Sequence, residues 1–197
     1  MTSLDSNAEP AGVGALLTRR SVSPKRLGWP APSDAQLALV IHAGLRAPDH
    51  AGLTPWRVIH IPMARRDDLA QLFVLEKQRR NPLASAEEIA RAREHATRAP
   101  TLLAFIVRVH ADALVPAHEQ WLAAGAALGN MLNAFHALGF GAIVLSGDRC
   151  ADNRLATALD VSDEERLAGF ISAGTVLQLP PAAPSKPVDR VWSTWRA

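Results

Sequence analysis

The fold of this chain is decided by the segment WLAAGAALGNMLNAFHALG (Trp121–Gly139) and by FGAIVLSG (Phe140–Gly147), which follows it. The first part contains no Asp, Glu, Lys or Arg, and its apolar residues fall on nearly every face of a helix. Such a helix must be enclosed by protein or by lipid. An apolar run, Ala142–Leu145, comes directly after the glycines that end this helix. The two parts together predict a buried helix that leads into a buried strand.

Polar residues interrupt this helix at three-residue spacing, at Asn130, Asn133 and His136. They share one stripe, and we expect them to find hydrogen-bond partners or a ligand. The small residues of 123–129 allow a second helix to approach closely, as at a subunit interface. At 1.5 Å per residue the helix is also about long enough for a membrane span. The polar stripe and the lack of basic flanks favour a helix in a core or a dimer interface.

Hydrophobic residues make up 48% of the 197 residues, which is enough for one sizeable core. We therefore expect a disordered tail at residues 1–10 and a single domain over residues 11–197. The net charge is only +2 and the basic residues are scattered along the chain. This composition gives no reason to expect a nucleic-acid partner.

A single cysteine, Cys150, excludes an internal disulfide and fits a reducing compartment. The segment Met1–Pro10 has neither the basic start nor the apolar centre of a signal peptide. We therefore expect a cytoplasmic protein.

The hydrophobic periodicity predicts the remaining elements. The run Thr101–Val109 is apolar almost throughout, as is typical of a strand buried on both faces at the centre of a sheet. The proline-rich stretch Pro180–Pro187 cannot join a helix or a central strand, and it predicts an extended arm that lies on a partner. Such an arm would account for the apolar Val191, Trp192 and Trp195. Other predicted strands are 56–61 and 167–176, and predicted helices are 13–20, 35–46, 66–77, 84–98, 152–159 and 163–166.

Two arginines, Arg19 and Arg20, stand before Ser21 at the end of the first predicted helix. Cations are favoured at a helix C-terminus, so the pair has a purely structural explanation. The alternative is a phosphate site, in which two guanidinium groups and a hydroxyl, with Lys25 and Arg26 nearby, donate to a dianion. The spacing by itself leaves both explanations open.

A shaped loop is predicted between Ala47 and Trp56, because it contains Pro48, Gly52 and Pro55. Binding groups are often placed on such loops. His50 is either one of these groups or an ordinary surface histidine.

Several familiar motifs are absent. Gly139-Phe140-Gly141 enters a strand and lacks the third glycine of a dinucleotide fingerprint. His118-Glu119 lacks the second histidine of a helical zinc site, so no metal is expected. Ser146 has Val144 two residues before it, where a nucleophile elbow needs glycine. Cys150 follows Arg149 but has no histidine near it in sequence, which favours an inert thiol.

Taken together, four blocks resemble the FMN-dependent nitroreductase family, most closely its short bacterial branch. The resemblance implies an α+β fold with a mostly antiparallel sheet flanked by helices. It also implies an intertwined homodimer with the long helix in the interface. The four blocks are Arg19-Arg20-Ser21, the loop from Arg46 to Trp56, Gly139–Gly147, and Gly169–Thr175.

The resemblance further implies that FMN lies in a groove between the subunits. Arg19, Arg20 and Ser21 would hold its phosphate and ribityl end, and Arg46 and His50 would reach it from the other subunit. The ring would be lined by Val144, Leu145 and Ser146.

The chemistry implied is hydride transfer from NAD(P)H through flavin N5 to a nitroaromatic or quinone-like acceptor. Because the flavin carries the hydride, no catalytic acid–base residue is expected. Arg46 is our candidate for stabilising the anionic reduced ring.

This sequence departs from the family pattern at two places. Val144 and Leu145 stand where relatives usually carry a tryptophan and a basic residue, and Arg149 or Lys186 is the candidate replacement. Thr54 stands where an amide side chain is common. Two alternatives stay open: a non-catalytic flavin-binding or storage dimer, and another flavin chemistry such as dehalogenation or flavin breakdown. The dehalogenating branch uses a tyrosine-bearing lid, and this chain has no tyrosine.

Overall fold

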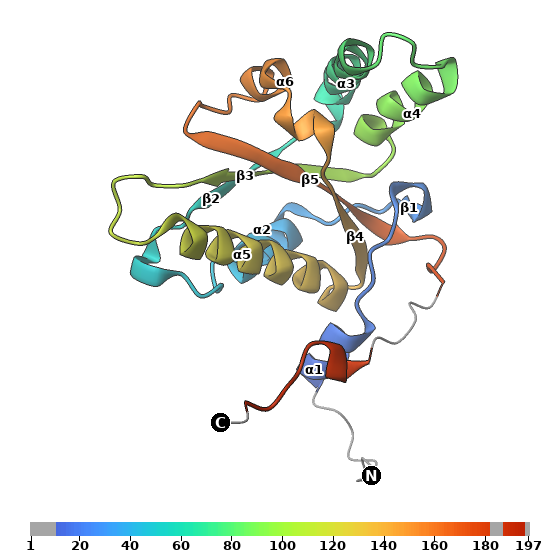
Figure 1. Cartoon of the computed structure of the whole chain (residues 1–197). Coiled ribbons are helices and arrows are strands. Elements are labelled where there is room, and N and C mark those ends of the chain that lie inside the picture. Colours follow the sequence, from blue (N-terminus) through green and yellow to red (C-terminus); the bar gives the residue numbers. More distant parts are fainter. Residues whose placement is uncertain (1–10, 182–186, 196–197) are drawn as a thin grey trace.

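A sheet lies between two groups of helices in the computed structural model of the chain (Figure 1). The structure describes residues 11–181 and 187–195. The expectations for residues 1–10 and for Lys186 therefore lie outside the described residues.

Within the described residues the sheet has five strands, and the pairs between these strands are antiparallel. The longest strand, β5, pairs with β3 and β1 and also with β4, while β2 pairs with β3. The predicted mostly antiparallel sheet flanked by helices is confirmed. The strands are β1 Leu27–Gly28, β2 Trp56–His60, β3 Thr101–Arg108, β4 Phe140–Leu145 and β5 Glu165–Val176.

Helices cover both faces of the sheet. One face carries α5 (Ala117–Ala137) and α2 (Asp34–Gly44), and α1 (Ala11–Thr18) contacts α5. The opposite face carries α3 (Arg66–Arg80), α4 (Ala86–Thr97) and α6 (Asn153–Ala158). Single 3-10 turns complete the described chain: η1 Pro24–Arg26, η2 His50–Gly52, η3 Met63–Arg65, η4 Asp148–Ala151 and η5 Val188–Arg190.

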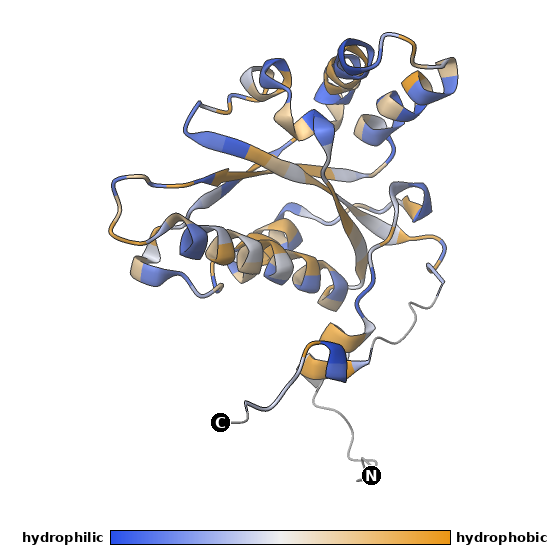
Figure 2. Cartoon of the chain, viewed as in Figure 1, coloured by the Kyte–Doolittle hydropathy of each residue, from blue (hydrophilic) through white to orange (hydrophobic). Residues whose placement is uncertain are grey.

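The strand β3 is buried on both faces, as its apolar run predicted. Leu103, Phe105 and Val107 belong to the cluster packed under α5 and α2. Their neighbours Leu102 and Ile106 belong to the cluster under α3, α4 and α6. Figure 2 shows apolar residues along the central strands, where alternation places successive side chains in the two cores.

Sequence signals explain how α2 is held against α5. Ser33 and Gln36 form a reciprocal capping box at the start of α2. At its end, a Cβ on Gly44 would lie 2.6 Å from Met131 Cε and 3.1 Å from the Trp56 ring, so a larger residue here would require these side chains to move. Asn130, from the polar stripe of α5, donates to the carbonyl of Ala43 at 3.2 Å. Part of the predicted stripe is thus satisfied by α2.

One predicted element is wrong. Residues 163–166 were expected to be helical, but Asp163 and Glu164 form a turn and Glu165 and Arg166 begin β5. The backbone of Glu165 pairs with Arg108, and its carboxylate receives two hydrogen bonds from the Arg57 guanidinium. These long-range contacts override the local helical preference.

The two ends of the described chain expose apolar side chains. On α1, Val13, Leu16 and Leu17 are exposed, and Figure 2 shows this helix as largely apolar. Beyond η5, Trp192 and Trp195 are exposed as well. No helix within residues 11–181 and 187–195 is both long and apolar enough to cross a bilayer.

Candidate functional site

The segment after α1 lies alongside β4. Ser21 forms an isolated parallel bridge with Ala142, and the Val22 amide donates to the Ala142 carbonyl at 3.1 Å. Arg19 and Arg20 directly precede this bridge, whereas the predicted helix had included them; α1 ends at Thr18. The bridge brings the arginine pair to the strand that carries Val144, two residues beyond Ala142.

The last turn of α5 helps to hold this segment. Thr18 Oγ1 lies 3.0 Å from His136 Nε2, so another member of the polar stripe is satisfied. Arg20 Nη1 donates to the Pro180 carbonyl at 3.3 Å, and Arg26 Nη1 donates to the Leu179 carbonyl at 3.0 Å. The two arginines therefore hold the chain where it leaves β5. A cavity of about 410 Å³ lies between these parts.

The charges of Arg19 and Arg20 are not neutralised by acidic side chains in residues 11–181 and 187–195. The ion pairs of that part of the chain occupy other arginines, such as Arg57, Arg79 and Arg108. Because Arg20 is exposed and donates to a neutral carbonyl, its positive charge can attract an anion.

The strand end Val144–Leu145 is half-buried, and Ser146 is exposed. Val144 packs against the core under α5. A Cβ on Gly169 would lie 3.0 Å from Val144 Cγ1 and 3.2 Å from the Leu145 carbonyl oxygen, so glycine at 169 lets β5 approach closely. The predicted lining residues thus lie on a rigid strand end near the arginine pair.

Of the other two predicted residues, His50 lies at the opposite end of α5. Arg46 follows α2 and is exposed, and His50 begins η2. His50 Nδ1 lies 2.8 Å from Glu119 Oε2 in the first turn of α5. From Glu119 to His136 the helix extends about 25 Å at 1.5 Å per residue. One chain therefore does not bring His50 together with Arg20, while Arg46 follows the end of α2, which contacts α5 at Asn130.

The loop that carries His50 has the defined shape that its prolines and glycine predicted. The Asp49 carboxylate accepts a hydrogen bond from the Thr54 amide at 2.6 Å. Ala51 and Thr54 have positive φ values of 63° and 47°, which non-glycine residues seldom adopt. Strain of this kind persists where surrounding contacts hold the backbone, and it is common at functional sites.

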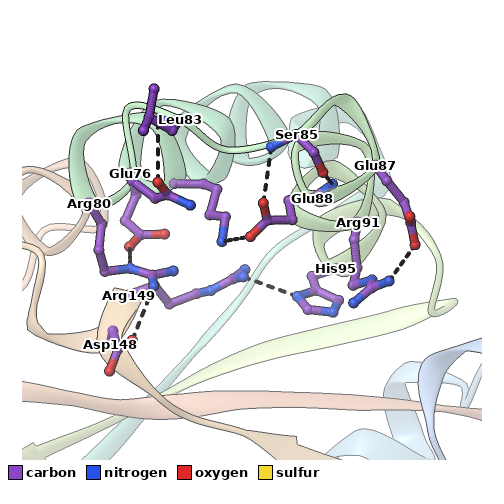
Figure 3. A network of polar contacts seen from close by, with 12 residues as sticks. Glu76, Arg80, Leu83, Ser85, Glu87, Glu88, Arg91, His95, Asp148 and Arg149 are labelled. Atoms are coloured by element: carbon purple, nitrogen blue, oxygen red, sulfur yellow. Dashed lines mark hydrogen bonds and ion pairs between the residues drawn. The ribbon is translucent and has the colours of Figure 1, made fainter.

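Arg149 does not lie with Arg20 and cannot replace the phosphate contact that Val144 and Leu145 lack. Its Nη2 lies 3.0 Å from His95 Nδ1 on α4 (Figure 3). Its guanidinium carbon lies 4.3 Å from the Phe73 ring centroid. Burial lowers the pKa of Arg149 below its usual value. The side chain anchors η4 to the helices on the far face of the sheet.

Neighbouring ion pairs support the same anchor. Arg80 Nε donates to Glu76 Oε1 at 2.6 Å, and Arg80 Nη1 lies 3.1 Å from Asp148 Oδ2 (Figure 3). The next residue along η4, Cys150, is half-buried, and burial raises the pKa of its thiol. A raised pKa disfavours the reactive thiolate, in line with the expected inert thiol.

Sequence reasoning missed Glu119 as a site residue, because its histidine partner is 69 residues away along the chain. His118-Glu119 had been considered only as part of a zinc motif. In the sequence, Glu119 looks only like an acidic residue that stabilises the start of a helix. Its closeness to His50 is created by the fold and cannot be read from the sequence. Within the ranges that the structure describes, no three His, Cys, Asp or Glu side chains gather as a metal site.

Comparison with known proteins identifies the family. A model described as "Nitroreductase family" matches residues 16–175. The chain belongs to the nitroreductase family. Among related nitroreductases, the Escherichia coli K12 protein named "Putative NAD(P)H nitroreductase YdjA" is 33% identical over 160 residues, which cover 81% of this chain and 85% of that protein. The resemblance stated from the four sequence blocks is confirmed.

Solved structures show the nitroreductase fold for this chain. A nitroreductase-like protein from Bacillus cereus has a TM-score of 0.80 at 15% identity, covering 97% of this chain and 99% of that one. A Desulfovibrio desulfuricans protein solved in complex with FMN has a TM-score of 0.73 at 23% identity, covering 96% and 99%. The α+β fold is thus confirmed, while the intertwined homodimer stays a prediction.

Proposed function

We propose that this nitroreductase is an FMN-dependent oxidoreductase that passes hydride from NAD(P)H to a nitroaromatic or quinone-like acceptor. The names of its relatives and the FMN complex of a structural neighbour support this assignment. The single observation that carries it is the Ser21–Ala142 bridge, which holds Arg19 and Arg20 beside β4.

The residues present fit a bound flavin phosphate. Arg19 and Arg20 supply guanidinium donors, Ser21 supplies a hydroxyl, and charge-assisted hydrogen bonds of this kind are the strong ones. Val144 and Leu145 continue along the same strand, and Ser146 follows its end with a hydroxyl. A flavin has the same order of parts: an anionic end, a polar chain and a flat ring.

We propose that Arg46 and His50 complete this site in a second copy of the chain. A two-fold axis that packs α5 against its symmetry mate in antiparallel orientation would place the first turn of one helix near the last turn of the other. The exposed side of α5 suits such packing, because Leu122 is 71% exposed and Gly125 and Gly129 allow close approach. Exposed apolar residues on α1 and near the C-terminus extend this surface.

In this arrangement the side chains of the protein would bind FMN and orient its ring. When bound, FMN supplies a ring that accepts hydride from NAD(P)H and passes it to an acceptor. The Arg46 guanidinium would stabilise negative charge on the ring, and the strand end at Val144–Ser146 would fix the plane of the ring. No acid–base dyad is needed for the hydride transfer itself.

The test is an absorbance assay of purified protein supplied with FMN under nitrogen. We expect bound flavin to be bleached by NADH or NADPH and to recover its colour when menadione or a nitroaromatic is added. Protein that binds FMN but is bleached by neither nucleotide would be a flavin-binding module without this activity. Protein that takes up no FMN would contradict the proposal entirely.

A further inference from the structure

The contact between His50 and Glu119 suggests a role for a side chain that the proposed function leaves unused. His50 Nδ1 and Glu119 Oε2 are 2.8 Å apart. The histidine comes from η2 and the glutamate from the first turn of α5, so the contact joins two separate elements. Both side chains line a cavity of about 360 Å³ on the exposed side of α5, together with Leu122 and Ala126.

Both members of the pair are held by neighbours. Next to Glu119, the buried Gln120 accepts from the His110 amide at 2.8 Å and donates to the Val115 carbonyl at 2.9 Å. These bonds fix the first turn of α5. On the other element, the Asp49–Thr54 hydrogen bond fixes the loop around His50. The geometry of the pair is therefore set by the backbone on each side.

This contact determines which nitrogen of His50 is available. An ionised carboxylate can only accept hydrogen bonds, so Glu119 requires a proton on Nδ1. The variable proton of the ring is then the one on Nε2. A carboxylate that holds an imidazole in one tautomer and compensates its charge is a known arrangement for proton transfer.

We propose that Glu119 is a positioning residue that directs His50 Nε2 to exchange a proton with the acceptor. This inference rests on the proposed function. Reduction of a quinone to a hydroquinone requires a hydride and one proton. NAD(P)H is the source of the hydride. The doubly protonated His50 ring, whose Nδ1 proton is held by Glu119, gives its Nε2 proton to the resulting oxyanion and becomes neutral, and Nε2 then takes up a proton from solvent. Hydride transfer alone would leave that oxygen charged.

The positioning is tested first on the protein without FMN, by ¹⁵N NMR of the histidine side chains at a pH where the ring is neutral. We expect His50 to carry its proton on Nδ1 in the wild type. In Glu119→Ala we expect the Nε2–H form to appear, and in Glu119→Gln the amide oxygen should preserve part of the original preference. The control is Glu164→Ala, which removes an exposed carboxylate paired with Arg108 at 2.7 Å. A wild-type ring with its proton on Nε2, or no change in Glu119→Ala, would overturn the positioning.

The proton transfer is tested by comparing two oxidants, with turnover expressed per bound flavin. Menadione needs a proton when it is reduced, whereas ferricyanide takes up electrons alone. We expect the menadione-to-ferricyanide turnover ratio to fall about tenfold or more in Glu119→Ala, less in Glu119→Gln, and not at all in Glu164→Ala. An unchanged ratio in Glu119→Ala would overturn the proton transfer. If no variant and no wild type binds FMN, the proposed function fails and the proton transfer fails with it, while the NMR result still decides whether Glu119 positions His50.

Discussion

Ser21 lies beside Ala142 in a parallel bridge, and this pairing fastens the N-terminal segment to the edge of the sheet. The bridge determines where the charges of Arg19 and Arg20 lie. Together with the Thr18–His136 contact, it fixes the segment that carries both guanidinium groups relative to β4. Arg20 lines a cavity with Phe140 and Gly141 at the start of β4, and Val144 lies farther along the same strand. An anionic group and an apolar ring can therefore be held along one strand.

Removing the Arg20 side chain should weaken FMN binding. In Arg20→Ala we expect a loss of about 1.5 to 3 kcal/mol, or roughly a 10- to 150-fold higher Kd, because a charged hydrogen bond to phosphate is lost. Quenching of flavin fluorescence in a titration measures the change. Arg91→Ala is the control, since Arg91 is an exposed arginine on α4 whose partner is Glu87. Equal Kd values for Arg20→Ala and the wild type would place the phosphate elsewhere.

A charge on the exposed side of α5 should separate the proposed dimer. Leu122 is 71% exposed in one chain, so Leu122→Glu should leave the folded monomer intact. In a dimer packed through α5 the carboxylate would be buried without a partner, at a cost of several kcal/mol. Light scattering should then show a monomer where the wild type is a dimer. Leu83→Glu, at a position 93% exposed and far from α5 in the sequence, should not change the mass. A Leu122→Glu protein that stays dimeric would rule out this interface.

Local hydrophobic patterns are sufficient to predict the elements that are buried on both faces. The apolar runs predicted β3 and α5 because burial on both faces leaves a continuous signal that needs no knowledge of partners. The error at 163–166 has the opposite origin. Glu165 favours a helix locally, but its partners Arg57 and Arg108 are far away in sequence.

The site residues likewise fall into those that local sequence reveals and those that only the fold reveals. Arg20 and Val144 were found as members of contiguous sequence blocks, and the structure places them on neighbouring segments. Glu119 was missed because its role depends on a contact with His50 that only the fold creates. Arg149 was a candidate replacement because of its nearness in sequence to Ser146, whereas the chain turns at Gly147 and carries it to Phe73.

Acid should destabilise the protein partly through Glu165. Its hydrogen bonds from Arg57 lower the pKa of this carboxyl from 4.5 to about 2 in the folded protein. A lowered pKa means that the stabilisation is fully present above about pH 4.5 and is lost as the pH falls toward 2. In Glu165→Gln we expect unfolding free energy at neutral pH to fall by about 1.5 to 3 kcal/mol.

Urea denaturation at pH 7 and pH 3 measures this effect. Between these two values the wild type should lose more stability than Glu165→Gln, because the amide does not titrate. Glu164→Gln serves as the control, since Glu164 is exposed and its pair with Arg108 lies at the surface. Equal losses of stability in the wild type and in Glu165→Gln would show that other carboxyl groups cause the destabilisation at low pH.

A mixed dimer can show whether Arg20 and Arg46 meet across two chains. We propose that each flavin site takes Arg20 from one chain and Arg46 from the other. A hybrid of an Arg20→Ala chain with an Arg46→Ala chain then has one site that lacks both arginines and one that is intact. Two different affinity tags allow this hybrid to be purified, and we expect it to bind about one FMN per dimer with wild-type affinity.

The second hybrid pairs a wild-type chain with a chain carrying both substitutions. If the sites are shared, each of its sites lacks one arginine, so no site with wild-type affinity should remain. If instead each chain supplied both arginines to its own site, the results would reverse: this second hybrid would keep one intact site and the first hybrid none. Because His50, on the loop after Arg46, contacts α5 about 25 Å along the helix from His136, which contacts the segment before Arg20, we expect the first pattern. Flavin titration of the two hybrids therefore separates a shared site from a site within one chain without relying on turnover.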